Sequence, residues 1–203
     1  MATARIKGIL WDNDGVLVDT EHHFYEANRQ VLAQHGVDLT PRQFLDWFML
    51  DNCGAWHLLT ARGYTQQQIH QLRQQRNALQ SELLRQCPSH SLALPGMPAL
   101  VKHLAPQVAM GVVTSSLREH FDIIHRELEF VPHMQFVLAD DSYANSKPAP
   151  DPYLLGLRRL GLTAAECLVV EDSPRGLLAA MVGSKLPEPT SKSWPKPVTG
   201  TVP

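Results

Sequence analysis

The sequence predicts an α/β protein in which a parallel sheet carries helices on both faces, because two kinds of segment alternate along much of the chain. Short apolar runs typical of strands lie at residues 6–11, 108–113, 135–138 and 167–171. Stretches with helical periodicity lie at residues 97–104, 117–127, 151–160 and 174–182. Strands that alternate with helices pair in parallel, and the helices then cover both faces of the sheet.

The long segment between the first two strand candidates has a different character. It shows helical patterning and no convincing strand, with helical stretches expected at residues 22–35, 41–50, 53–62 and 65–86. Ligands bind beyond the carboxyl ends of parallel strands, so the polar residues that follow each strand candidate are the candidate site residues.

Length and composition bound the class of protein. The 203 residues are 44% hydrophobic, which is enough for a sizeable core in one domain or in a domain with a large insertion. The formal net charge of -2 provides no basic field for nucleic acid or for a membrane surface. The apolar runs are too short for a signal peptide or a spanning helix, so a cytoplasmic protein is expected. Three widely spaced cysteines, Cys53, Cys87 and Cys167, argue against a disulfide framework.

Two carboxylates, Asp12 and Asp14, follow the first strand candidate. Side chains on a strand alternate between faces, so these two share one face and Asn13 turns away. Such a pair suits a Mg²⁺ and phosphate site, and it also occurs in a solvated acidic turn that ends at Gly15. A calcium loop is excluded, because it needs Gly at position six and Glu at position twelve, whereas Gly15 is fourth and Glu21 is tenth.

Three hydroxyl residues, Thr114, Ser115 and Ser116, follow the second strand candidate. Hydroxyls and backbone amides at a junction between strand and helix suit an anion, although the same residues often serve only as a helix cap.

Two further charged groups follow later in the chain. Lys147 lies in the proline-rich segment 146–153, where a lysine is commonly a solvated loop charge. Glu171 and Asp172 end the apolar run of residues 167–170, and they suit either a metal site or the start of a helix.

Taken together in this order, the four motifs resemble those of the haloacid dehalogenase-like hydrolases, in particular the branch of phosphatases and β-phosphoglucomutase-like proteins. The resemblance implies a Rossmann-like core with an all-helical cap inserted after the first motif. It also implies an enzyme that hydrolyses a small phosphorylated metabolite, such as a sugar phosphate, with Mg²⁺. The second acid, Asp14, separates phosphatases from the dehalogenases of the family.

The resemblance also implies roles for the motif residues. Asp12 would attack phosphorus to give an aspartyl-phosphate, and Asp14 would act as the general acid and base. Thr114 would bind the transferring phosphoryl group, and Lys147 would neutralise negative charge. The implied phosphate- and substrate-binding residues are Gly15, Ser115, Ser116, His23, Asn52 and Gly54. The implied Mg²⁺ ligands are Asp12, Asp14, Glu171 and Asp172.

The implied organisation is a core at residues 1–18 and 94–183 and a cap at residues 19–93, with hinges near Asp19-Thr20 and Ser91-Pro95. Residues 184–203 form an atypical proline-rich tail in which the fifth strand expected for the family is missing. An exposed sheet edge there would favour association, so a monomer or a weak homodimer is expected.

Two alternatives to the phosphatase remain open. A phosphomutase resembling β-phosphoglucomutase shares the four motifs, but the segment Asn52-Cys53-Gly54 lacks the basic residue that holds the second phosphate there. A catalytically weakened binding or assembly protein is suggested only by the tail.

Overall fold

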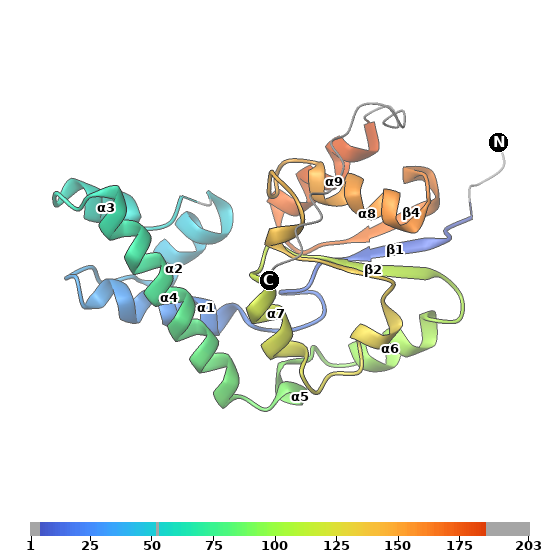
Figure 1. Ribbon diagram of the computed structural model, residues 1–203, viewed down its shortest axis with the longest axis horizontal. Coiled ribbons are helices and arrows are strands. Elements are labelled where there is room, and N and C mark those ends of the chain that lie inside the picture. The colour runs from blue at the N-terminus through green and yellow to red at the C-terminus, as the bar shows by residue number, and fades with distance from the viewer. Residues whose placement is uncertain (1–4, 52, 186–203) are drawn as a thin grey trace, which may run out of the picture.

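The computed structural model describes residues 5–51 and 53–185, and it confirms the predicted α/β class. Four parallel strands form one sheet in the order β3-β2-β1-β4 (Figure 1). Their bounds are Gly8–Trp11 for β1, Ala109–Val113 for β2, Val137–Leu138 for β3 and Cys167–Val170 for β4. Because β1 is flanked by β2 and β4, the ends of these three strands lie next to one another at one edge of the sheet.

Helices cover both faces of the sheet, as the alternation of apolar side chains along β1 requires. Ile9 and Trp11 belong to a core cluster with residues of α6 (Met97–Leu104) and α7 (Arg118–His125). Leu10 faces the opposite way and packs with residues of α8 (Asp151–Leu160) and α9 (Pro174–Lys185). Figure 1 shows α6 and α7 below the sheet and α8 and α9 above it.

The segment between β1 and β2 is helical, as predicted. It contains α1 (Glu21–Ala33), α2 (Pro41–Phe44), the π-helix η1 (Leu45–Leu50), α3 (Trp56–Ala61), α4 (Gln66–Gln86) and α5 (Ser89–Leu92). Residues 41–50 are helical throughout, as predicted, and the chain changes from α2 to a π-helix at Leu45.

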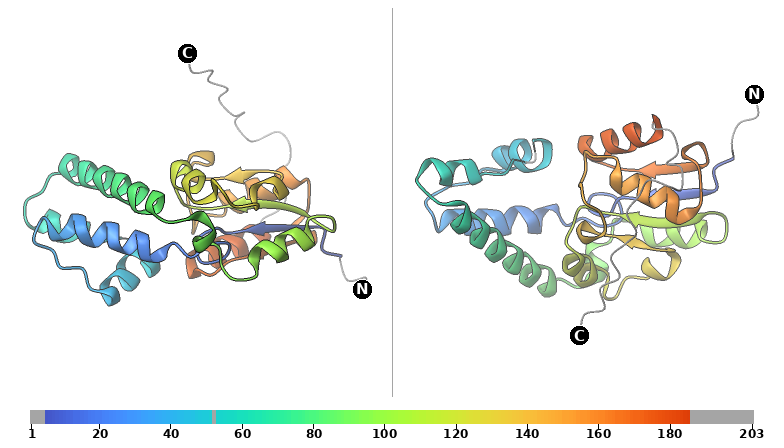
Figure 2. Two further views of the ribbon diagram at one scale, coloured as in Figure 1. Left: turned by 90° about the horizontal axis from the view of Figure 1, so that it is seen from below. Right: turned by 45° about the horizontal axis from the view of Figure 1, so that its top comes forward.

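The helices α1 to α4 share a hydrophobic cluster of their own, which includes Phe44, Trp56 and Leu59. The long helices α1 and α4 run side by side away from the sheet (Figure 2). Trp56 is buried in this cluster, so it packs within the helical part. The division at residues 19–93 stays a prediction.

The two chain segments that join the helical part to the sheet lie side by side. The backbone N–H of Asp19 donates to the carbonyl oxygen of Leu92 at 2.8 Å, and that of Leu94 donates to Leu17 at 3.0 Å. These contacts fall at the two predicted hinges.

Short elements that the sequence did not predict complete the chain. They are α5 and three 3-10 turns, η2 (Val131–His133), η3 (Asp140–Ser142) and η4 (Ala164–Glu166). The helix α9 includes Ser184 and Lys185, and the rest of the predicted tail lies outside the described residues. No helix in the described part of the chain is both long and apolar enough to cross a bilayer.

Candidate active site

The center of the site is the ammonium group of Lys147, which lies in the loop before α8. Its Nζ atom donates to Oδ1 of Asp12 at 2.9 Å and to Oε1 of Glu171 at 2.6 Å. It also donates to the carbonyl oxygen of Val113 at 2.9 Å, at the end of β2. These contacts join the ends of β1, β2 and β4. Because Lys147 is only 3% exposed, they lie in a region that excludes most water.

Three carboxylates form a possible metal site beside this lysine. Asp12, Glu171 and Asp172 each offer an oxygen atom, and these atoms all lie within 4.8 Å of one another. Carboxylate oxygens are the ligands that Mg²⁺ prefers, so the chemistry of the donor set fits this ion. Burial raises the pKa of Asp12 to about 7, with Lys147 opposing the change and Glu171 adding to it. Holding buried carboxylates close together in their charged form costs free energy, and a bound cation would offset this cost.

The carboxylate of Glu171 is held on both oxygens. The hydroxyl of Tyr153 donates to Oε1 at 2.9 Å, and Ser173 donates to Oε2 through its N–H at 3.0 Å and its hydroxyl at 2.9 Å. Burial alone would raise the pKa of Glu171, but the charge of Lys147 and the hydrogen bonds from Lys147 and Ser173 outweigh it and lower the pKa. Glu171 therefore stays ionised next to Lys147.

The loop of the first motif can approach Asp172 only because residue 15 is glycine. Gly15 has a φ of +79°, and a Cβ atom there would lie 1.9 Å from Oδ2 of Asp172. Any side chain at this position would displace the carboxylate, so Gly15 acts here through its small size.

Asp14 points toward the second motif. Its Oδ2 atom accepts hydrogen bonds from the hydroxyls of Ser116 at 2.6 Å and Thr114 at 3.3 Å, and its Oδ1 atom accepts one from Thr20. Its carboxylate lies outside the group formed by the other three acids, so its predicted role as a metal ligand stays a prediction. Ser115 is exposed at the same strand end.

The predicted substrate contacts in the helical part are less well supported. Nε2 of His23 lies 3.1 Å from Sγ of Cys87, so this ring joins the start of α1 to the end of α4. Gly54 donates its N–H to the carbonyl oxygen of Trp47 at 2.8 Å, and Asn52 lies outside the described residues. The substrate-binding roles of His23, Asn52 and Gly54 stay predictions.

Sequence reasoning missed Tyr153 and Thr20 as contacts of the site. Thr20 lies between Asp14 and Glu21, and Tyr153 ends the proline-rich segment 146–153, but residue type alone indicated no role for either. The hydrogen bonds of both depend on side-chain orientation.

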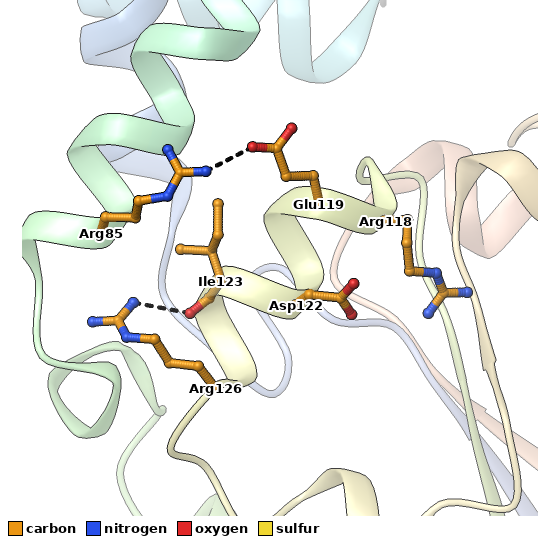
Figure 3. A pocket seen from close by; sticks show the side chains of 6 residues that line it. All are labelled: Arg85, Arg118, Glu119, Asp122, Ile123 and Arg126. Atoms are coloured by element: carbon orange, nitrogen blue, oxygen red, sulfur yellow. Dashed lines mark hydrogen bonds and ion pairs between the residues drawn. The ribbon is translucent and has the colours of Figure 1, made fainter.

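A separate surface hollow lies between α4 and α7 (Figure 3). It is lined by Arg85, Arg118, Glu119, Asp122, Ile123 and Arg126. Arg85 pairs with Glu119 at 2.8 Å, and Arg126 donates to the carbonyl oxygen of Ile123 at 2.9 Å, so these cations already have partners. None of the candidate site residues lines this hollow.

Comparison with known proteins identifies the class. The sequence model described as haloacid dehalogenase-like hydrolase matches residues 9–182. Hexitol phosphatase A of Escherichia coli (strain K12) is 29% identical over 181 residues, covering 87% of this chain and 79% of that protein. The fructose-1-phosphate phosphatase of the same strain is 28% identical over 180 residues, covering 87% of this chain and 92% of that protein.

The solved structures agree on the fold. β-Phosphoglucomutase from Clostridium difficile superposes with a TM-score of 0.75 at 19% identity, covering 88% of this chain and 82% of that one. The fold, the site and the relatives define a phosphoric monoester hydrolase. The chain belongs to the haloacid dehalogenase-like hydrolase family, as the four motifs indicated.

Proposed function

We propose that this protein is a Mg²⁺-dependent phosphatase that hydrolyses a small phosphorylated metabolite through an aspartyl-phosphate. The observation that carries the proposal is the buried contact of Lys147 with Asp12 and Glu171, beside three carboxylates whose oxygens lie within 4.8 Å of one another.

Asp12 is the proposed nucleophile. It stands at the end of the central strand, and its carboxylate would form the bond to phosphorus while the bond to the leaving oxygen breaks. Lys147 holds Oδ1 of Asp12 at 2.9 Å, so its positive charge lies where negative charge gathers in the transition state.

Mg²⁺ is the proposed cofactor, and Asp12, Glu171 and Asp172 are the residues that would hold it. When bound, the ion would offset the negative charge of the phosphate and of the carboxylates around it.

Asp14 is the proposed general acid and base. In the first step it would give a proton to the leaving oxygen, and in the second it would take a proton from the water that cleaves the aspartyl-phosphate. Its contacts with Ser116 and Thr114 keep the carboxylate beside the residues proposed to bind the phosphoryl oxygens. These hydroxyls can turn toward the phosphate when substrate is present.

A sugar phosphate or a similar monoester is the proposed substrate class. The names of the relatives specify hexitol and fructose 1-phosphate, and a relative from Thermotoga maritima is a phosphorylated carbohydrates phosphatase. The helical part beside the site would cover the substrate and contact its leaving group. A cytoplasmic location and a monomer or weak homodimer stay predictions from the sequence.

The test is a hydrolysis assay of the purified chain with MgCl₂, on p-nitrophenyl phosphate and a broad panel of phosphorylated metabolites. Release of inorganic phosphate that is lost in Asp12→Asn supports the proposal. Full turnover by Asp12→Asn, or no hydrolysis of any compound by the wild type, contradicts it. Conversion of a hexose 1-phosphate to the 6-phosphate without phosphate release would instead support the mutase.

A further inference from the structure

Asn13, the residue between the two catalytic aspartates, has a buried partner far away in the sequence. Its side chain is 0% exposed, and its Oδ1 atom lies 2.7 Å from Nε2 of His125, at the end of α7. His125 is 6% exposed. The two residues therefore meet inside the protein.

Asn13 also organises the backbone of the loop. Its carbonyl oxygen accepts hydrogen bonds from the N–H groups of Val16 at 3.2 Å, Leu17 at 2.8 Å and Val18 at 3.1 Å. A shift of Asn13 would move this whole turn, and with it the backbone of Asp12 and Asp14 on either side of Asn13.

His125 itself is held by aromatic neighbours. Its ring stacks on the ring of Phe121, with the two centroids 4.1 Å apart. It also meets the ring of Phe130 in an edge-to-face arrangement, with the centroids 5.7 Å apart. Burial lowers the pKa of His125 to about 4, so the ring is neutral near pH 7. A neutral ring that faces an amide oxygen carries its proton on Nε2 and donates it.

A contribution to the stability of the fold does not explain why this polar pair is present. It lies among apolar residues of the core, and Nδ2 of Asn13 and Nδ1 of His125 have no hydrogen-bond partner among the described residues. Buried polar atoms without partners destabilise a protein, whereas two apolar side chains of similar shape would cost little or nothing. What the pair supplies, and apolar packing does not, is one defined orientation of Asn13.

We infer that His125 is a positioning residue, which holds Asn13 and thereby the relative placement of Asp12 and Asp14. The inference rests on the proposed function, in which both carboxylates must meet the same phosphate.

The experiment compares four variants with the wild type by steady-state kinetics and urea unfolding. In His125→Leu and in Asn13→Leu/His125→Leu, kcat is expected to fall between tenfold and about 10²-fold, with KM close to the wild-type value, because misplaced catalytic groups slow the chemical step. The double variant is expected to unfold near the wild-type urea midpoint. His125→Gln, whose amide N–H can donate to Asn13, is expected to recover part of kcat, and the core control Ile124→Val is expected to keep it.

A double variant that folds and keeps the wild-type kcat would overturn the inference. If the double variant does not fold, His125→Gln and His125→Leu decide, and equal kcat values for these two would overturn it. If the wild type hydrolyses nothing, the proposed function fails separately. Crystal structures of the wild type and His125→Leu then decide, since an unmoved loop from Asp12 to Asp14 contradicts the inference and a displaced loop supports it.

Discussion

Lys147 and Glu171 are 24 positions apart in the chain, yet Nζ of the lysine lies 2.6 Å from Oε1 of the glutamate. This contact ties the loop before α8 to the end of β4. Because Lys147 also holds Asp12, one buried ammonium group connects the proposed nucleophile to the group of carboxylates that would bind Mg²⁺.

Replacing this lysine is therefore expected to slow catalysis strongly. In Lys147→Met, kcat should fall by roughly 10²-fold or more, the size of effect seen when one preorganised electrostatic contact to a transition state is lost. Steady-state kinetics with excess Mg²⁺ measures the change. The exposed lysine of α6 offers a control, and Lys102→Met should keep the wild-type kcat. Wild-type turnover by Lys147→Met would remove the role assigned to this residue.

Binding of Mg²⁺ is expected to stabilise the folded protein through Asp172. A ligand that binds only the folded state adds about 2.7 kcal/mol when its concentration is 100 times Kd. Thermal unfolding in a series of MgCl₂ concentrations should show Tm rising for the wild type and changing little for Asp172→Asn. The control Asp122→Asn removes an exposed carboxylate outside the group and should respond as the wild type does. If Tm rises as much in Asp172→Asn as in the wild type, Asp172 is not a ligand of the ion.

A methyl group at Gly15 is expected to damage the metal site more than the fold. Gly15 and Gly63 both have positive φ, +79° and +87°, so alanine is strained at either position, by roughly 1 kcal/mol or more. Only at Gly15 would the new Cβ contact a carboxylate, since nothing lies within 4 Å of a Cβ at Gly63. Both variants should lose stability, while only Gly15→Ala should lose phosphatase activity and Mg²⁺ affinity, measured by kinetics and calorimetry. Similar activity in the two variants would contradict this role of Gly15.

His125 is expected to make the protein sensitive to acid. Burial lowers its pKa from 6.5 to about 4, so between these pH values the unfolded chain binds a proton that the folded protein excludes. Stability therefore falls as the pH decreases through this window, by up to about 1.4 kcal/mol per pH unit for one such group. Urea unfolding from pH 7 to pH 4 should give a shallower loss in His125→Leu than in the wild type or Ile124→Val. If all three proteins lose the same stability between pH 7 and pH 4, the His125 ring takes up a proton in the folded protein as readily as in the unfolded chain.

Much of the sheet and of the site could be predicted because the signals are local. The predicted helices at residues 97–104 and 151–160 coincide with α6 and α8, since periodicity and flanking Gly or Pro mark their ends. Asp12, Lys147, Glu171 and Asp172 follow strands or lie in a strand-end loop, and parallel strands bring such residues to one edge. The π-helix at Leu45–Leu50 had no such signal, because its periodicity is close to that of an ordinary helix.

By itself, the sequence determined the family, the order of the motifs and the residue types that the chemistry needs. Only the tertiary structure decided which groups touch. Ser116 meets Asp14 across 102 positions, and His125 meets Asn13 across 112. These contacts depend on how α7 packs against the sheet and on side-chain orientation, and a hydrogen bond exists only within a few tenths of an ångström and a limited range of angles. Residue types and spacing carry no information at that precision, so they predict the chemistry of the site but not the contacts that position it.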